Sequence, residues 1–239
     1  MFPTLFDYNF NEKERMKKLL FLILSSLPII LIGQNLQFHY DFGKASDNGN
    51  DIQRDYFTTT LEFFKPDKLG STFLFVDIDF NKTGGGASLS YFEIARKFII
   101  HKKSGLSLQL EYNDGTPDFM NSAWLAGFSY PLKIGKVTIH TSILYKAYKN
   151  ARNPDAQLTL VWQHQICKNK LLFKGFIDIW TQDDLLSDDK NLVFLSEPQL
   201  WYILNEHFSI GSEIEISKNL FTFDGDFEIM PTLSLMWTF

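Results

Sequence analysis

The fold is decided by the stretch Phe227-Glu228-Ile229-Met230-Pro231-Thr232-Leu233-Ser234-Leu235-Met236-Trp237-Thr238-Phe239. Its odd positions are all apolar, whereas its even positions are Glu, Met, Thr, Ser, Met and Thr. Successive side chains of a strand point to opposite faces, so this period of two predicts a β-strand with one apolar and one polar face. The same alternation recurs in residues 105–111, 157–163 and 208–217, and no segment shows a helical stripe with a period of 3.6.

Strands with this alternation follow one another along the whole chain after the first 33 residues. We predict twelve of them, over residues 36–44, 54–65, 71–80, 87–98, 105–113, 121–131, 136–148, 156–166, 170–182, 191–204, 207–217 and 227–239. The connections alternate between short turns (66–70, 99–104, 132–135, 167–169, 205–206) and generally longer loops (45–53, 81–86, 114–120, 149–155, 183–190, 218–226). Short turns at one rim and longer loops at the other are typical of outer-membrane barrels, whose strands are about 9–11 residues long.

Composition excludes several classes of protein. The 239 residues are 45% hydrophobic and 16% aromatic, which a disordered chain is not. One cysteine permits neither an intramolecular disulfide framework nor a multi-cysteine metal site. A formal net charge of −5 gives no support for a nucleic-acid partner.

The N-terminal residues 1–33 have the pattern of an export signal. Met16-Lys17-Lys18 is followed by an uncharged apolar run over residues 19–32, which is shorter than a membrane-spanning helix. We predict that Met16 is the true start and that cleavage falls near Gly33 and Gln34, leaving residues 34–239 as the barrel. The alternative is an N-terminal membrane anchor.

The direction of the apolar face separates two barrel classes. A soluble secreted barrel buries its apolar side chains, whereas an outer-membrane barrel turns them toward lipid. The export signal, the mixed polar face and the bulky aromatics near strand ends favour the membrane barrel; these aromatics are Trp124, Tyr130, Trp162, Trp237 and Phe239. We therefore predict an all-β, twelve-stranded antiparallel transmembrane barrel in the outer membrane of a Gram-negative bacterium, in contact with outer-membrane lipid.

Two resemblances to known proteins support this prediction. Phe239, with Trp237, Leu235 and Leu233 at alternate positions, resembles the C-terminal signal of Gram-negative outer-membrane barrels, which implies the barrel assembly machinery as a partner. Residues 38–44, 60–67, 71–77, 92–96, 195–202 and 211–217 resemble a family of uncharacterised outer-membrane proteins that is similar to the Tsx-type nucleoside-specific channels. That resemblance implies a monomeric twelve-stranded barrel and nucleosides as the solute. It assigns no contact residue.

If Phe239 faces lipid, the alternation assigns a set of side chains to the interior. The inward acidic and polar residues are His39, Asp41, Glu62, Asp77, Asp79, Glu93, Glu111, Asp178, Glu197, Gln199, Glu213, Glu215 and Glu228. The inward cations are Lys97, His140, Lys146 and Lys174, and the inward aromatics are Phe73, Phe75, Tyr91, Phe176, Trp180 and Trp201. The excess of carboxylates predicts a lumen that disfavours anions and admits cations or neutral solutes.

We expect an outer-membrane channel, not an enzyme, through which small solutes diffuse passively. The predicted substrate-binding set is Phe73, Phe75, Asp77, Tyr91, Glu93, Glu111, Phe176, Asp178, Trp180, Glu197, Gln199, Trp201 and Glu213, because aromatic faces stack on bases and carboxylates accept hydroxyl protons. The competing interpretation of each carboxylate is structural pairing in a narrow lumen. The corresponding alternative function is a non-conducting structural or surface-binding barrel.

Three further patterns in the sequence bear on function. His140 and Ser142 share a strand face, as a lipid hydrolase would need. Lys146 lies on the same face, and this predicts that the face is luminal, because a lysine facing the middle of the lipid layer costs about 2–4 kcal/mol.

Asp77 and Asp79 near Gly84–Gly86 provide too few oxygens for calcium, so we expect neither metal nor cofactor. Pro198 interrupts a strand, which indicates either a bulge that re-aims Glu197 and Gln199 or a plain kink.

Overall fold

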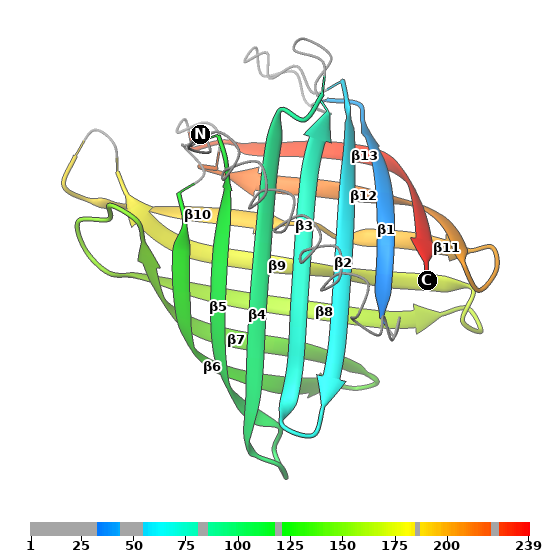
Figure 1. The fold of residues 1–239 in the computed structure, drawn as a ribbon, viewed down its shortest axis with the longest axis horizontal. Coiled ribbons are helices and arrows are strands. Elements are labelled where there is room, and N and C mark those ends of the chain that lie inside the picture. Colours follow the sequence, from blue (N-terminus) through cyan, green and yellow to red (C-terminus); the bar gives the residue numbers. More distant parts are fainter. Residues whose placement is uncertain (1–32, 44–54, 81–85, 118–120, 185–186, 221–224) are drawn as a thin grey trace, which may run out of the picture. The chain divides into compact units, whose positions relative to one another are not determined.

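The computed structural model describes residues 33–43, 55–80, 86–117, 121–184, 187–220 and 225–239. The predicted export signal lies outside these residues, apart from Gly33, and stays a prediction. In the described part every regular element is a β-strand (Figure 1). No helix there is long and apolar enough to cross a membrane.

Thirteen strands are present, and they agree with the twelve predicted strands to within a few residues. They are β1 (Gln34–Asp41), β2 (Phe57–Asp67), β3 (Gly70–Phe80), β4 (Leu89–His101), β5 (Leu106–Thr116), β6 (Ala123–Ile134), β7 (Val137–Tyr148), β8 (Asp155–Ile166), β9 (Leu171–Asp183), β10 (Lys190–Ser196), β11 (Gln199–Ile203), β12 (Phe208–Lys218) and β13 (Phe227–Thr238).

The sheet closes on itself. Apart from β10 and β11, strands that follow one another in the chain pair antiparallel, and β13 pairs with β1 through a register in which Phe38 lies opposite Leu235 (Figure 1). β10 and β11 together occupy one place in the wall, because both pair with β9 on one side and β12 on the other. The architecture is therefore the predicted twelve-stranded antiparallel barrel, with one strand divided in two.

The division at Glu197 and Pro198 is a kink. Ser196 lies opposite Ile177 and Gln199 opposite Lys174, so the register on β9 is the same before and after the break. A bulge would have shifted it by one residue, so the bulge interpretation is wrong here. Gly175 makes room for the proline, because a Cβ at position 175 would lie 2.9 Å from the Pro198 Cα.

The outer face is apolar and the inner face is mostly polar. Trp237 and Ile214 on the outside are 42% and 38% exposed, whereas Gln37 and Ser142 on the inside are fully or almost fully buried. This arrangement is the one expected of an outer-membrane barrel and the reverse of that in a soluble one. One part of the inner wall departs from the prediction of a polar lining, because Ala123, Leu125 and Leu144 form a small apolar cluster there.

The two rims differ as predicted. Short turns join β2 to β3, β4 to β5, β6 to β7, β8 to β9 and β11 to β12, and longer connections lie at the opposite rim. The start of β1 and the end of β13 are both at the short-turn rim, where the Phe239 N–H donates to the Gln34 carbonyl at 3.2 Å.

Candidate functional site: the barrel interior

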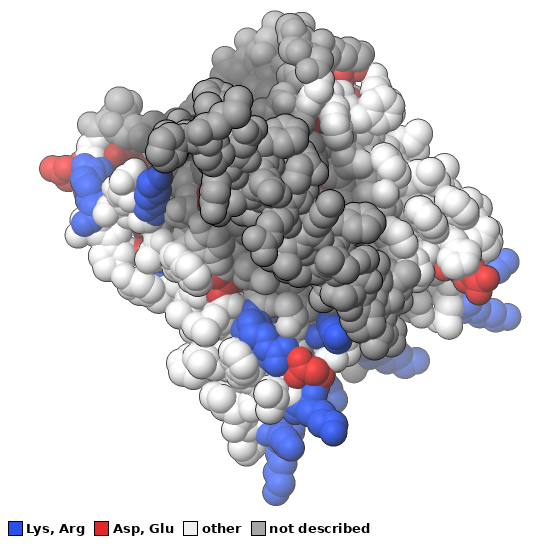
Figure 2. All heavy atoms as spheres, in the orientation of Figure 1, with Lys and Arg blue, Asp and Glu red and all other residues white. Residues whose placement is uncertain are grey.

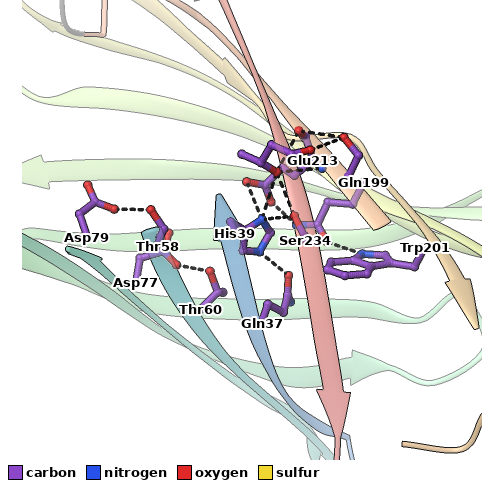
Figure 3. Close-up of polar contacts among 12 residues, drawn as sticks. Gln37, His39, Thr58, Thr60, Asp77, Asp79, Gln199, Trp201, Glu213 and Ser234 are labelled. Carbon is purple, nitrogen blue, oxygen red and sulfur yellow. Dashed lines mark hydrogen bonds and ion pairs between the residues drawn. The ribbon is translucent and has the colours of Figure 1, made fainter. Parts of the chain in front are cut away.

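A hydrogen-bonded chain of side chains starts at His39 on β1 (Figure 3). The His39 Nδ1 lies 2.8 Å from the Ser234 Oγ of β13, and its Nε2 lies 3.0 Å from the Gln37 Oε1. The amide oxygen of Gln37 can only accept, so the Nε2 carries the proton and the Nδ1 is free to accept. His39 is thus held in one orientation between two strands.

The chain continues to the strands on one side of His39. The Trp201 Nε1 donates to the Gln199 Oε1 at 2.9 Å, and the Gln199 Nε2 donates to the Glu213 carboxylate (Figure 3). Glu213 in turn lies 3.8 Å from the His39 Nδ1, and the Trp201 ring meets the His39 ring edge to face at 6.0 Å. Gly211 leaves space for Trp201, because a Cβ there would lie 2.7 Å from the indole.

In the other direction the chain crosses the barrel. Gln37 donates to Asn35 at 2.7 Å, Asn35 donates to the Glu62 Oε2 at 2.8 Å, and the Lys174 Nζ lies 2.6 Å from the same oxygen. Glu62 is on β2 and Lys174 is on β9, and these strands are not neighbours in the sheet. This ion pair, which we call the cross-lumen pair, therefore spans the interior and narrows it.

A second group of polar side chains lines the wall around β5 to β9. Ser142 donates to Gln109 at 2.8 Å, and Gln109 donates to Glu111 at 2.7 Å. Lys146 donates to Gln157 at 2.7 Å, and its ammonium lies 4.5 Å from the Tyr148 ring and 4.4 Å from the Trp180 ring. Gln157 donates to Thr159 at 3.0 Å, and Thr159 donates to Asp178 at 2.5 Å.

Carboxylates from distant strands are close enough inside the barrel to interact electrostatically. Glu93 and Glu111, on β4 and β5, interact electrostatically with Asp178 on β9. Asp77 on β3 likewise interacts with Glu213 and Glu215 on β12. Lys97, Lys146 and Lys174 interact with the same carboxylates, which outnumber them. The charged groups of the interior are therefore mostly acidic, which is the charge that the sequence predicts.

The predicted aromatic residues do not form one continuous surface. Phe73, Phe75 and Tyr91 lie in series on β3 and β4, with ring centroids 6.5 and 6.2 Å apart. Trp180 contacts Lys146, and Trp201 packs on His39 and is fully buried. Among the predicted aromatics, the three rings on β3 and β4 are therefore the ones that pack in series.

The remaining inward residues lie where the alternation places them. Asp77 and Asp79 accept hydrogen bonds from Thr60 and Thr58, the second at 2.7 Å (Figure 3). Ser142 is luminal, as predicted, and its hydroxyl donates to Gln109. The other members of the inward set, at register positions on the inner face, are Asp41, Lys97, His140, Phe176, Glu197, Glu215 and Glu228. Among the described residues, no group of three or more His, Cys, Asp or Glu side chains is arranged to hold a metal ion.

Sequence reasoning missed the amides that connect these groups. Asn35, Gln37 and Gln109 share strand faces with residues of the predicted inward set, so the period-two alternation could have identified them. Gln157 lies opposite Trp180 of that set on the neighbouring strand. These amides were missed because the prediction of the interior considered mainly charged and aromatic residues. The amides matter because each one connects two other polar side chains of the interior.

The long-loop rim carries its own ionic network. The Arg152 guanidinium lies 2.6 Å from Asp188, and the Lys190 Nζ lies 2.7 Å from Asp183. The Arg152 backbone N–H donates to Asp183 at 2.6 Å. Hydrogen bonds from Lys190 and from this N–H hold the pKa of the Asp183 carboxyl below its ordinary value of 3.8. The connections before β8 and before β10 are therefore tied together.

Comparison with known proteins places the chain in a family and a fold. A family model described as "Domain of unknown function (DUF5020)" matches residues 33–239, and the chain belongs to that family. No curated protein matches the chain.

Solved structures share the fold at low sequence identity. A NanC porin matches with a TM-score of 0.56 and 7% identity, covering 87% of this chain and 100% of the porin. The outer membrane phospholipase A from Escherichia coli matches with a TM-score of 0.52 and 11% identity, covering 89% of this chain and 93% of the phospholipase. At these identities the similarity shows a common barrel architecture, that of outer-membrane proteins.

Proposed function

We propose that this member of the family is an outer-membrane channel of a Gram-negative bacterium that passes small cationic or neutral solutes, and that residues 1–33 direct its export. The observation that carries the proposal is the acidic interior of a barrel with an apolar outer face. Rings of carboxylates favour cations in channels, and a low-dielectric wall strengthens their field. Porins among the proteins of the same fold are consistent with this function.

Within this proposal, nucleosides are the candidate solute. The rings of Phe73, Phe75 and Tyr91 offer a surface on which a base could stack, and Asp77 on the same strand as two of them could accept ribose hydroxyl protons. The contacts of a solute with these rings and with Asp77 would each be weak. Conduction requires weak contacts, because a solute must leave the lumen as well as enter it. We further propose that the barrel acts as a monomer and is inserted by the assembly machinery through the strand that ends at Phe239.

A planar-bilayer experiment tests the channel. We expect the purified protein to give a small conductance and a reversal potential that shows cation preference in a KCl gradient. Adding a nucleoside should reduce the current, and Phe75→Ala should weaken that block while leaving the cation preference in place. A conducting barrel with anion preference would contradict the proposed mechanism, and a block by sugars with none by nucleosides would contradict the solute.

A second candidate function is favoured by one observation. The cross-lumen pair of Glu62 and Lys174, together with the burial of inward polar residues, supports a barrel too filled to conduct. Such a protein would have a structural or surface-binding role. Silence of both the wild type and a Lys174→Met variant in bilayers, with folded barrels in both samples, would favour this second function.

Lipid hydrolysis is not proposed. Ser142 is 1% exposed on the inner face and donates its hydroxyl proton to Gln109, so it does not meet the lipid acyl chains. Phospholipid hydrolysis by the wild type that is lost in Ser142→Ala would contradict this placement.

A further inference from the structure

The short-turn rim is strongly basic. A pair of exposed lysines lies at or beside each of the turns that join β2 to β3, β4 to β5, β6 to β7 and β8 to β9. These residues are Lys65, Lys68, Lys102, Lys103, Lys133, Lys136, Lys168 and Lys170. In Figure 2, lysine and arginine side chains project at the bottom and right of the view, where Figure 1 places short turns, with a few acidic side chains beside them.

Few acidic residues neutralise this rim. At the short turns the described carboxylates are Asp67 and Glu206. Asp67 is already engaged, because the Arg96 Nη2 donates to its Oδ1 at 3.0 Å. The opposite rim is different in character, since Asp183, Asp184, Asp188 and Asp189 lie there, and its Arg152 and Lys190 are paired with two of these aspartates. The chain as a whole is acidic, so the basic rim is a local feature and not a result of overall composition.

Apolar side chains lie directly beside these lysines. Leu69, Ile134 and Ile100 are 65%, 58% and 54% exposed, and each is within two residues of a rim lysine. A lysine can lay its aliphatic stem along such a surface and raise its ammonium toward water. The combination therefore matches the boundary of a lipid layer, where acyl chains end and phosphate headgroups begin.

We propose that the short-turn rim binds the phosphate headgroups of anionic phospholipids in the leaflet beside it. Lysine clusters next to a membrane-spanning segment attract anionic lipids by about 1 kcal/mol for each residue. The lysines are spread over four turns around the barrel and do not form a single patch, which suits several small headgroups better than one folded partner. In outer-membrane barrels the short turns face the periplasm, so the leaflet concerned is the periplasmic one.

Native mass spectrometry of the barrel in micelles with equal amounts of phosphatidylglycerol and phosphatidylcholine tests this proposal. We expect wild type to retain phosphatidylglycerol in preference, by about fivefold for each occupied lysine site, since 1.4 kcal/mol corresponds to tenfold. The variant Lys68→Gln, Lys102→Gln, Lys136→Gln and Lys168→Gln should lose most of the preference. A control at the other rim, Lys149→Gln with Lys218→Gln, should keep it.

Several results would overturn the proposal. They are equal retention of the two lipids by wild type, an unchanged preference in the four-lysine variant, and an equal loss in the control. Competition by millimolar inorganic phosphate would indicate a site for free anions. Binding of soluble polyphosphate without any lipid preference would indicate a soluble partner. The four substituted lysines are exposed in turns, so we expect the variant to fold, and a circular dichroism spectrum like that of wild type would verify this. Neither the mass spectrometry nor the circular dichroism depends on whether the barrel conducts.

Discussion

Replacing Lys174 by Met removes one end of the cross-lumen pair and leaves Glu62 without its cation. The two side chains are only 11% and 20% exposed, and their charged atoms are 2.6 Å apart, so water screens them weakly. Asn35 would remain as a donor to Glu62, but an amide does not neutralise a carboxylate. Removing one partner of a buried pair costs about 3–5 kcal/mol, and we expect the free energy of unfolding to fall by about 3 kcal/mol because one hydrogen bond is kept.

The double variant Lys174→Met with Glu62→Gln should recover most of this loss. It buries no unpaired charge, and replacing both members of a buried pair is often close to neutral. We expect it to unfold within about 1 kcal/mol of wild type, which gives a large coupling energy between the two positions. Urea unfolding in detergent micelles, followed by tryptophan fluorescence, measures all four proteins of the cycle.

The exposed Lys149→Met is the matched control, because surface substitutions usually stay within about 0.5 kcal/mol. If Lys174→Met costs no more than this control and its effect simply adds to that of Glu62→Gln, the two residues do not hold opposite walls together. The reasoning that this ion pair crosses and narrows the interior would then be refuted.

In bilayers, the double variant should also carry a larger current than wild type if the barrel conducts.

Three more predictions follow from single features of the barrel. Brominated lipids should quench the fluorescence of Trp124, which is 65% exposed on the outer face, and spare the buried Trp201; equal quenching would contradict the assignment of faces. Gly211→Val should destabilise by about 1–3 kcal/mol in urea unfolding and alter the near-ultraviolet circular dichroism of the indole, since its Cβ would clash with Trp201. Because the pKa of Asp183 is lower in the folded chain than its ordinary value of 3.8, its ionised carboxylate stabilises the long-loop rim at pH values above 3.8. This stabilisation is lost as the pH falls through the lowered pKa of the folded chain. Proteolysis of the rim should therefore increase in acid for wild type, whereas Asp183→Asn should be cleaved readily at every pH.

The wall of the barrel was predictable because it repeats one local rule. A strand with lipid on one side and polar groups on the other must alternate, so the sequence itself indicates that Glu213 faces inward and Ile214 outward. The short turns could be predicted in the same way from the length of the connections. The kink at Pro198 was harder, because a proline removes the same ladder hydrogen bond whether or not a residue is inserted, and only the register separates the two cases.

The contacts of the interior were not predictable from alternation. That rule places Glu62 and Lys174 inside, but their meeting depends on the tilt and closure of the whole sheet. The same holds for Trp201, which alternation places inside and which packs on His39, fully buried. Side chains from distant strands meet only after closure, and the spacing within one strand carries no information about that.

The inner face carries many more carboxylates than lysines among the residues described. Electroneutrality requires that this surplus be offset, and the surrounding lipid can supply nothing. Protons, or small cations drawn from the water at the two rims, are the charges that can offset what the inner lysines do not. The composition of the electrolyte is therefore expected to affect how stable the folded barrel is.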